Sequence, residues 1–227
     1  MSREIRVSDD PAAEVAERLT EAAMAGDDVV FTGGSTPKRA YELAAERDAD
    51  WSAAHVWFAD ERCVEPTHPD SNFGMADRAL LSQLSAAPSV HRMAGELGPD
   101  AGAGDYEAEI RARMGAEPRW NLLLLGMGPD GHVASLFPGK PEIEERSRLA
   151  VGVPLAGMEP QVPRITLTMP AIRSAREAIL LVTGESKAAT VARVFGPAPD
   201  TSLPAARVEL RYGTLTVLLD QAAASQL

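Results

Sequence analysis

Short apolar segments alternate with amphipathic segments along this chain, and the alternation predicts strands separated by helices. The runs at 29–31 and 122–125 are apolar without interruption, as in strands buried on both faces of a parallel sheet. The pattern predicts strands at 5–7, 28–32, 55–59, 89–93, 121–125, 149–153, 164–168, 178–183 and 214–219. It predicts helices at 11–25, 37–47, 73–83, 105–114 and 186–195, a short tail helix, and a mobile stretch rich in glycine, proline and alanine at 95–104.

Strands that alternate with helices are typical of βαβ units with right-handed crossovers. We therefore predict an α/β fold, a doubly wound, mostly parallel sheet with helices on both faces, in a Rossmann-like three-layer sandwich. No internal repeat or long linker divides the chain, so we expect a single domain over residues 1–227. The segments 138–148 and 196–206 are expected to be connectors or lids.

The composition excludes several classes of partner. The chain has 227 residues, and its 22 basic and 33 acidic residues give a formal net charge of −11. Such a charge repels nucleic acid and anionic membranes, and no apolar stretch reaches the roughly 18 residues that cross a bilayer. With no apolar signal segment at its N-terminus and Cys63 as its single cysteine, the chain is expected in the reducing cytoplasm. We expect a monomer or weak homodimer that binds a small molecule.

The segment after the central strand carries the most specific candidate chemistry. The strand at 121–125 runs into Gly126-Met-Gly-Pro-Asp-Gly-His132, which places Asp130 and His132 beyond a carboxyl end, where parallel sheets bind ligands. Imidazole suits proton transfer at neutral pH, and Asp130 could orient it. The alternative is a plain turn in which His132 only caps the segment that follows.

A second glycine turn, Gly33-Gly-Ser-Thr-Pro37, follows another apolar strand. Gly33 and Gly34 let the backbone approach a ligand, and Ser35 and Thr36 add hydroxyl donors. Thr36 is expected to cap a helix whose first residue is the proline and whose free N–H groups favour a phosphate. The turn is neither a Walker loop nor a dinucleotide-binding fingerprint, and a tight connection that binds nothing is the alternative.

Three consecutive charged residues, Asp60, Glu61 and Arg62, follow the next strand. Arg62 could hold a phosphate or carboxylate through two hydrogen bonds, and Asp60 or Glu61 could orient it or act as an acid–base group. An ion-pair cluster at the sheet edge is the alternative. Ser71 and Asn72 are expected to cap a helix rather than to touch a ligand.

Two distant basic residues are candidates for binding the same anion. Arg164 begins a strand. Lys187 lies in the first turn of a helix, where a cation opposes the helix dipole unless an anion compensates it. That anion could be a ligand or simply Glu185.

The remaining histidines, His55, His68 and His91, have no chemical context in the sequence and are expected to be structural or exposed. No pair of histidines has metal-ligand spacing. We therefore expect no metal site. We also expect no cofactor.

Taken together, these segments resemble 6-phosphogluconolactonases. The resemblance is carried by Gly33–Pro37, Asp60–Val64, Ser71-Asn72, Gly126–Pro138 and Arg164–Thr168, in the family's order. It implies a metal-free hydrolase of the oxidative pentose phosphate pathway that converts 6-phospho-D-glucono-1,5-lactone to 6-phosphogluconate. In that family the histidine matching His132 is taken as the general base, and groups matching Arg62, the glycine turn and Lys187 surround the phosphate and the sugar.

The mechanism expected on this resemblance is attack of water on the lactone carbonyl, with His132 as the base. Ser135 is not expected to be a nucleophile, because its segment lacks the Gly-x-Ser-x-Gly elbow. Backbone N–H groups of the turn at 126–131, or Arg62, would stabilise the oxyanion.

Two rival functions stay open. A glucosamine-6-phosphate deaminase carries Asp-Glu-Tyr and Phe-Asn-Glu-Pro where this chain has Asp60–Arg62 and Ser135–Pro138. The other rival is a non-catalytic sugar-phosphate sensor.

Overall fold

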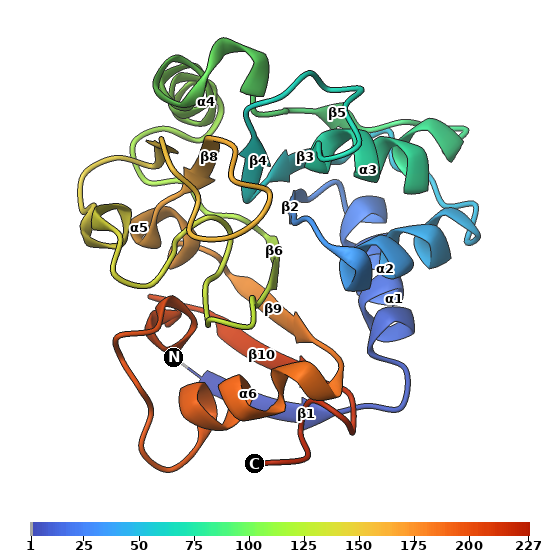
Figure 1. Ribbon diagram of the computed structural model, residues 1–227. Coiled ribbons are helices and arrows are strands. Elements are labelled where there is room, and N and C mark those ends of the chain that lie inside the picture. The colour runs from blue at the N-terminus through green and yellow to red at the C-terminus, as the bar shows by residue number, and fades with distance from the viewer. Residues whose placement is uncertain (1) are drawn as a thin grey trace.

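A seven-stranded parallel sheet forms the centre of the computed structural model, which describes residues 2–227 (Figure 1). Its strands lie in the order β1-β10-β9-β6-β2-β3-β5, and every neighbouring pair is parallel. The bounds are β1 Ser2–Val7, β2 Asp28–Phe31, β3 His55–Phe58, β5 Ser89–Val90, β6 Leu122–Gly126, β9 Glu177–Val182 and β10 Thr214–Leu219. The doubly wound, mostly parallel α/β fold expected from the sequence is confirmed.

Successive residues of the central strands pack into two hydrophobic clusters, one on each face of the sheet. In β6, Leu122 and Leu124 pack on one face and Leu123 and Leu125 on the other, because side chains alternate along a strand. The first face is covered by α1 (Pro11–Met24), α2 (Ser35–Ala45) and α3 (Asn72–Ala79). The second is covered by α4 (Pro99–Met114), α5 (Met169–Ile172) and α6 (Ala188–Phe195) (Figure 1). The uninterrupted apolar runs therefore mark strands that are buried on both sides.

A three-stranded antiparallel sheet lies over the second face. It consists of β4 (Asp60–Arg62), β8 (Arg164–Leu167) and β7 (Ala150–Val153), in that order, and α4 packs against β7 and β8. The strands predicted from the sequence did not include residues 60–62. The segment is a strand because it pairs with β8, which lies far away in the chain.

Three local predictions are wrong. Helix α4 begins at Pro99, after Gly98 in a left-handed conformation (φ 82°), so residues 99–104 are helical rather than a mobile connection capped by Asp105. Helix α2 begins at Ser35, after Gly34, so Thr36 is not its cap. The tail beyond β10 forms turns instead of a helix.

The remaining connections contain short 3₁₀ turns. They are η1 Leu81–Gln83, η2 Gly95–Leu97, η3 Pro141–Glu144, η4 Glu185–Lys187 and η5 Pro204–Arg207. The expected connectors at 138–148 and 196–206 contain η3 and η5. None of the helices within residues 2–227 combines the length and apolarity that crossing a bilayer requires.

Candidate active site

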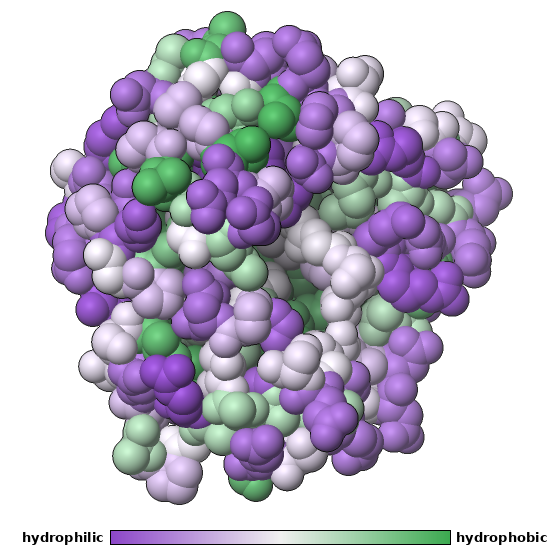
Figure 2. Space-filling model, viewed as in Figure 1, coloured by the Kyte–Doolittle hydropathy of each residue, from purple (hydrophilic) through white to green (hydrophobic). Residues whose placement is uncertain are grey.

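One cavity gathers the candidate chemistry at the carboxyl ends of β2, β3, β6 and β9. Its volume is about 250 Å³, and Figure 2 shows it as a hollow in the face of the molecule. Neighbouring strands β2 and β6 are followed by segments that pack on opposite faces of the sheet, and doubly wound sheets bind ligands at such a point. All of the site residues expected from the sequence line this cavity except Asp130 and Glu61.

The glycine turn after β2 forms one wall of the cavity. Gly34 has a φ of 113°, which suits only glycine, and it lets α2 begin at Ser35 beside the cavity. Gly33 is required for another reason, because a Cβ there would lie 2.0 Å from Oδ1 of Asn72. The first N–H groups of a helix have no partner within the helix, so the start of α2 favours an anion at this wall.

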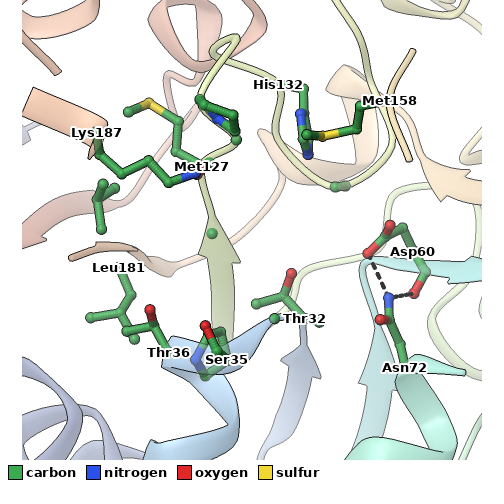
Figure 3. A pocket seen from close by; sticks show the side chains of 18 of the residues that line it. Thr32, Ser35, Thr36, Asp60, Asn72, Met127, His132, Met158, Leu181 and Lys187 are labelled. Atoms are coloured by element: carbon green, nitrogen blue, oxygen red, sulfur yellow. Dashed lines mark hydrogen bonds between the residues drawn. The ribbon is translucent and has the colours of Figure 1, made fainter. Parts of the chain in front are cut away.

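Lys187 lies near the same wall (Figure 3). The hydroxyls of Thr36 and Thr183 are 2.7 Å apart, which ties the glycine turn to the segment that carries Lys187. Lys187 Nζ donates to the carbonyl of Met127 at 2.9 Å. Burial lowers the pKa of Lys187, and the charge of Asp130 opposes that shift only in part. Within residues 2–227 Lys187 makes no ion pair, so Glu185 does not compensate it.

Asp130 orients the imidazole of His132. Nδ1 of His132 lies 2.6 Å from Oδ1 of Asp130, and because a carboxylate only accepts, Nδ1 carries a proton. In the neutral imidazole the acceptor nitrogen is then Nε2. Burial raises the pKa of Asp130, but the hydrogen bond with the His132 side chain, the charge of His132 and backbone N–H donors together outweigh burial, and the net pKa is lowered. Asp130 is therefore an ionised carboxylate at neutral pH. A Cβ on Gly128 would lie 2.1 Å from the imidazole, so glycine is needed for the ring to fold over the turn.

Three backbone N–H groups in and beside this turn already have acceptors. The N–H of Gly128 donates to the carbonyl of His132 and that of Gly131 to the carbonyl of Gly128, both at 3.0 Å. The N–H of His132 donates to Asp130 at 3.2 Å. These three groups already have acceptors, so side chains at the cavity are the simpler candidates for stabilising an oxyanion.

Strands β4 and β8 bring three charged side chains to one face. Arg62 lies directly opposite Arg164 in the antiparallel register, and Asp60 lies opposite Thr166. Residues two apart on a strand share a face, so Asp60, Arg62 and Arg164 all point to the cavity that they line. Burial lowers the pKa of Arg164, Asp60 raises it and the neighbouring Arg62 lowers it further.

The carboxylate of Asp60 is buried and held by neutral donors. Its Oδ1 accepts from Asn72 Nδ2 at 3.0 Å, and its Oδ2 accepts from Ser135 Oγ at 2.6 Å (Figure 3 shows the contact with Asn72). Asn72 was expected only to cap a helix. Ser71 is the cap of α3, whereas Asn72 lines the cavity.

Glu61 points away from the cavity and holds α3 in place. Its carboxylate accepts from the hydroxyl of Ser71 at 2.9 Å and from the N–H groups of Asn72 and Phe73 at 2.7 and 2.8 Å. Burial raises the pKa of Glu61 and these hydrogen bonds oppose it. Of the two acid–base candidates after β3, Glu61 is thus a helix anchor and Asp60 is the one that faces the cavity.

The sequence reading missed Asn72, Thr183 and Met158 as cavity residues. Thr183 carries a usable signal, because it is a polar residue directly after β9, which ends at the cavity. Asn72 carries a weaker one, as a polar residue at the start of α3. Met158 carries none, since it lies in an irregular loop and reaches the cavity beside His132 only through the tertiary fold (Figure 3).

The other histidines and the cysteine lie outside the cavity. His55 and His91 are hydrogen-bonded to each other at 2.9 Å, and His68 is exposed. Burial raises the pKa of the Cys63 thiol to about 11, so it is protonated at neutral pH. Across residues 2–227, no group of three or more histidine, cysteine, aspartate or glutamate side chains is arranged to hold a metal ion.

Comparison with known proteins gives consistent relationships. Residues 3–217 match the family described as glucosamine-6-phosphate isomerases/6-phosphogluconolactonase. A 6-phosphogluconolactonase of Streptomyces coelicolor is 41% identical over 222 residues, which cover 91% of this chain and 84% of that protein.

Solved structures agree in fold. A 6-phosphogluconolactonase from Trypanosoma cruzi superposes with a TM-score of 0.87 at 29% identity, over 100% of this chain and 98% of that one. A monomeric glucosamine-6-phosphate deaminase superposes with a TM-score of 0.81 at 18% identity, over 100% of both chains. At that identity the second likeness shows the fold alone.

Proposed function

The chain belongs to the family of glucosamine-6-phosphate isomerases and 6-phosphogluconolactonases, and on that premise we propose that it hydrolyses 6-phospho-D-glucono-1,5-lactone to 6-phospho-D-gluconate, in the oxidative pentose phosphate pathway. The observation that carries this choice is the imidazole of His132, oriented by Asp130 and placed in a cavity with cationic groups at two separate places. The product has two anionic groups, a phosphate at C6 and a carboxylate at C1, and the cavity offers a place for each.

We assign the general base to His132. Its Nε2 accepts a proton from water as the water oxygen bonds to C1 of the lactone, and Asp130 stabilises the imidazolium that forms. The tetrahedral intermediate then breaks the bond between C1 and the ring oxygen, and the imidazolium returns the proton to that oxygen. His132 is neutral again when the hydroxy acid leaves.

We assign the developing oxyanion to the arginine pair. Arg164 lies with its guanidinium carbon 5.8 Å from the centre of the Phe137 ring, and the His132 ring is 4.7 Å from the same ring, so base and guanidinium lie at the same end of the cavity. Charged donors that are fixed before the reaction stabilise an oxyanion without a reorganisation cost. Arg62, opposite Arg164 on β4, adds the second cation.

We assign the phosphate to the glycine turn and Lys187. The start of α2, the hydroxyls of Ser35 and Thr36 and the ammonium of Lys187 lie on the side of the cavity away from Asp60 and Asn72 (Figure 3). A phosphate is favoured by a helix N-terminus and by an unpaired cation. Binding energy gained there holds the lactone carbon against His132.

We further propose that the reaction needs no metal ion and takes place in the cytoplasm. The imidazole supplies the base and the guanidiniums supply the positive charge that a metal would otherwise provide. A single cysteine suits a reducing compartment. Activity that persists after exhaustive treatment with a chelator supports the first statement, and loss of activity that Zn²⁺ or Mg²⁺ restores contradicts it.

The test of the proposed function is acid release from freshly prepared lactone, followed in weak buffer against the spontaneous rate. We expect the wild-type chain to accelerate hydrolysis strongly. Glucosamine 6-phosphate, given to the same preparation, should yield no ammonia. A chain that binds 6-phosphogluconate but leaves the spontaneous rate unchanged would be a sensor, and ammonia release would make it a deaminase.

A further inference from the structure

Two like charges face each other across β4 and β8 without the partner that each would normally find. Arg62 and Arg164 are directly opposed in the register, a placement in which like charges repel. Arg62 donates to the carbonyl of Asp70 and Arg164 to that of Pro160, and neither forms an ion pair within residues 2–227. The Nε groups of both arginines are buried and have no hydrogen-bond partner among the described residues.

A carboxylate that could neutralise them lies within reach. Asp60 is diagonal to Arg164 in the same antiparallel pair, and diagonal neighbours on one face are close enough for a long side chain to bridge. Asp60 is only 5% exposed, so an ion pair there would be little screened by water. That ion pair is nevertheless absent from the described structure, because both carboxylate oxygens are turned to other donors.

The donors that hold Asp60 are neutral, and one of them is locked in place. Ser135 is fully buried, its Oγ donates to Asp60 Oδ2 at 2.6 Å, and its N–H donates to Thr166 Oγ1 at 3.1 Å. The preceding residue, Ala134, has a φ of 50°, an uncommon conformation for a residue with a Cβ. The turn after His132 therefore bends so that the serine hydroxyl reaches the carboxylate beneath the cavity.

We propose that Ser135 is a positioning residue: together with Asn72 it holds the carboxylate of Asp60 away from Arg62 and Arg164, so that both guanidiniums stay free for an anionic group of the ligand. The inference rests on the proposed function only for the identity of that ligand. The physical basis is a competition between the carboxylate of Asp60 and the ligand anion for the two guanidiniums. If Ser135 loses its hydroxyl, Oδ2 of Asp60 loses its neutral donor, and two guanidiniums with unpartnered Nε groups lie on the same face of the β4–β8 pair. An internal ion pair then forms and excludes the ligand anion.

The test is a double-mutant cycle read by calorimetric binding of 6-phosphogluconate. We expect Ser135→Ala to raise the dissociation constant about tenfold, the lower range for a lost hydrogen bond to a charged group. In the background of Asp60→Asn, whose neutral amide cannot form an ion pair with a guanidinium, Ser135→Ala should change the dissociation constant less than about twofold. Ser174→Ala removes another half-buried hydroxyl, which donates to Ala171 far from the cavity, and serves as the matched control.

Three results would overturn the inference. The first is an unchanged dissociation constant in Ser135→Ala. The second is an equal loss of affinity when Ser135→Ala is made in the wild type and in Asp60→Asn, which marks a merely structural role. The third is a wild-type chain that binds no 6-phosphogluconate. Thermal unfolding of each variant identifies any that fails to fold. If Ser135→Ala does not fold, Ser135→Thr, which keeps the hydroxyl, replaces it. Ser135→Thr should bind 6-phosphogluconate as the wild type does. Weaker binding by a folded Ser135→Thr counts against the inference.

A second ligand identifies the anion that the arginines hold. Glucitol 6-phosphate has the phosphate but no carboxylate. If Ser135→Ala weakens only 6-phosphogluconate, the arginines hold the carboxylate end, and if it weakens both ligands equally, they hold the phosphate. Either result supports the competition. Lactone hydrolysis is measured separately, so a chain that binds with this pattern but does not hydrolyse would reject the proposed function and keep the inference.

Discussion

The two ends of strands β2 and β3 carry similar residue types and use them in opposite ways. At the amino ends, Asp28 accepts from Trp57 Nε1 at 2.9 Å and from Arg113 Nε at 2.7 Å. His55 is hydrogen-bonded to His91, which in turn contacts Glu109. At the carboxyl ends, a carboxylate and two arginines share one face, and none of them forms an ion pair with another residue of the described part of the chain, 2–227.

This difference separates the end of the sheet that stabilises the fold, the amino ends, from the end that lines the cavity, the carboxyl ends. At the amino ends each charge meets a partner, so the cluster contributes to stability and has no free group to offer. At the carboxyl ends the charges are kept apart by neutral side chains, at some cost in stability, and the unpaired cations face a cavity. Unpaired buried charge is expensive, so its presence there points to a ligand.

The largest expected effect is loss of the base. His132→Ala should lower kcat for lactone hydrolysis by about 10²-fold or more, because the water loses its proton acceptor. His68→Ala, at an exposed histidine, is the matched control and should leave the rate unchanged. The readout is the initial rate of acid release. A His132→Ala chain that works at the wild-type rate would remove His132 from the mechanism.

Replacing one arginine at each end of the sheet by methionine tests the comparison between the two ends. Arg164→Met should raise KM or lower kcat, with kcat/KM falling about 30-fold, while the free energy of unfolding stays the same or rises because a repulsion is relieved. Arg113→Met should leave kcat/KM unchanged and lower the free energy of unfolding by about 1 kcal/mol, since Asp28 loses its charged partner. Kinetics and urea unfolding separate the two effects. Equal effects of both variants on activity would erase the distinction.

Asp130→Asn removes the charge behind the base and keeps its shape. We expect kcat to fall about tenfold with KM little changed, because the imidazolium loses a charged hydrogen bond that matters in the transition state. Asp200→Asn alters an exposed carboxylate that pairs with Arg193 and provides the control. A rise in KM without a fall in kcat would place Asp130 in substrate binding instead.

The smallest effect concerns pH and the amino ends. Burial lowers the pKa of His55, Arg113 and His91 lower it further and Asp28 opposes them, so the folded chain takes up this proton less readily than the unfolded chain. Stability from His55 is therefore fully present above the unfolded imidazole pKa near 6.5 and is lost as the pH falls below it. Wild-type Tm should drop between pH 7.5 and 5.5 by more than the Tm of His55→Asn. The same drop in both would show that His55 does not carry the dependence.

Most of the sheet could be read from the sequence because its signals are local. The run at 122–125, the glycine turn after β2 and the Asp130–His132 spacing each lie within a few residues, and parallel strands bring such turns to one edge. What failed depended on distant partners. Residues 60–62 form a strand only because β8 pairs with them.

The predicted start of α4 was wrong for the same reason. Gly102 lies inside that helix, and a Cβ there would be 2.4 Å from Ile165 Cδ1. The glycine therefore permits close packing on β8 and does not mark a mobile connection. Within the site, Asn72 and Ser135 were not recognised as partners of Asp60, since their contacts join three segments that only the tertiary fold brings together.

The central claim is that one hexose derivative spans two cationic places in a single cavity, with the reacting carbon beside His132. A crystal structure of the chain with 6-phosphogluconate tests it most directly. We expect the phosphate against residues 34–36 and Lys187, and the carboxylate within hydrogen-bond distance of Arg62 or Arg164 and next to His132. A ligand bound outside this cavity, or one whose C1 lies away from His132, would contradict the account.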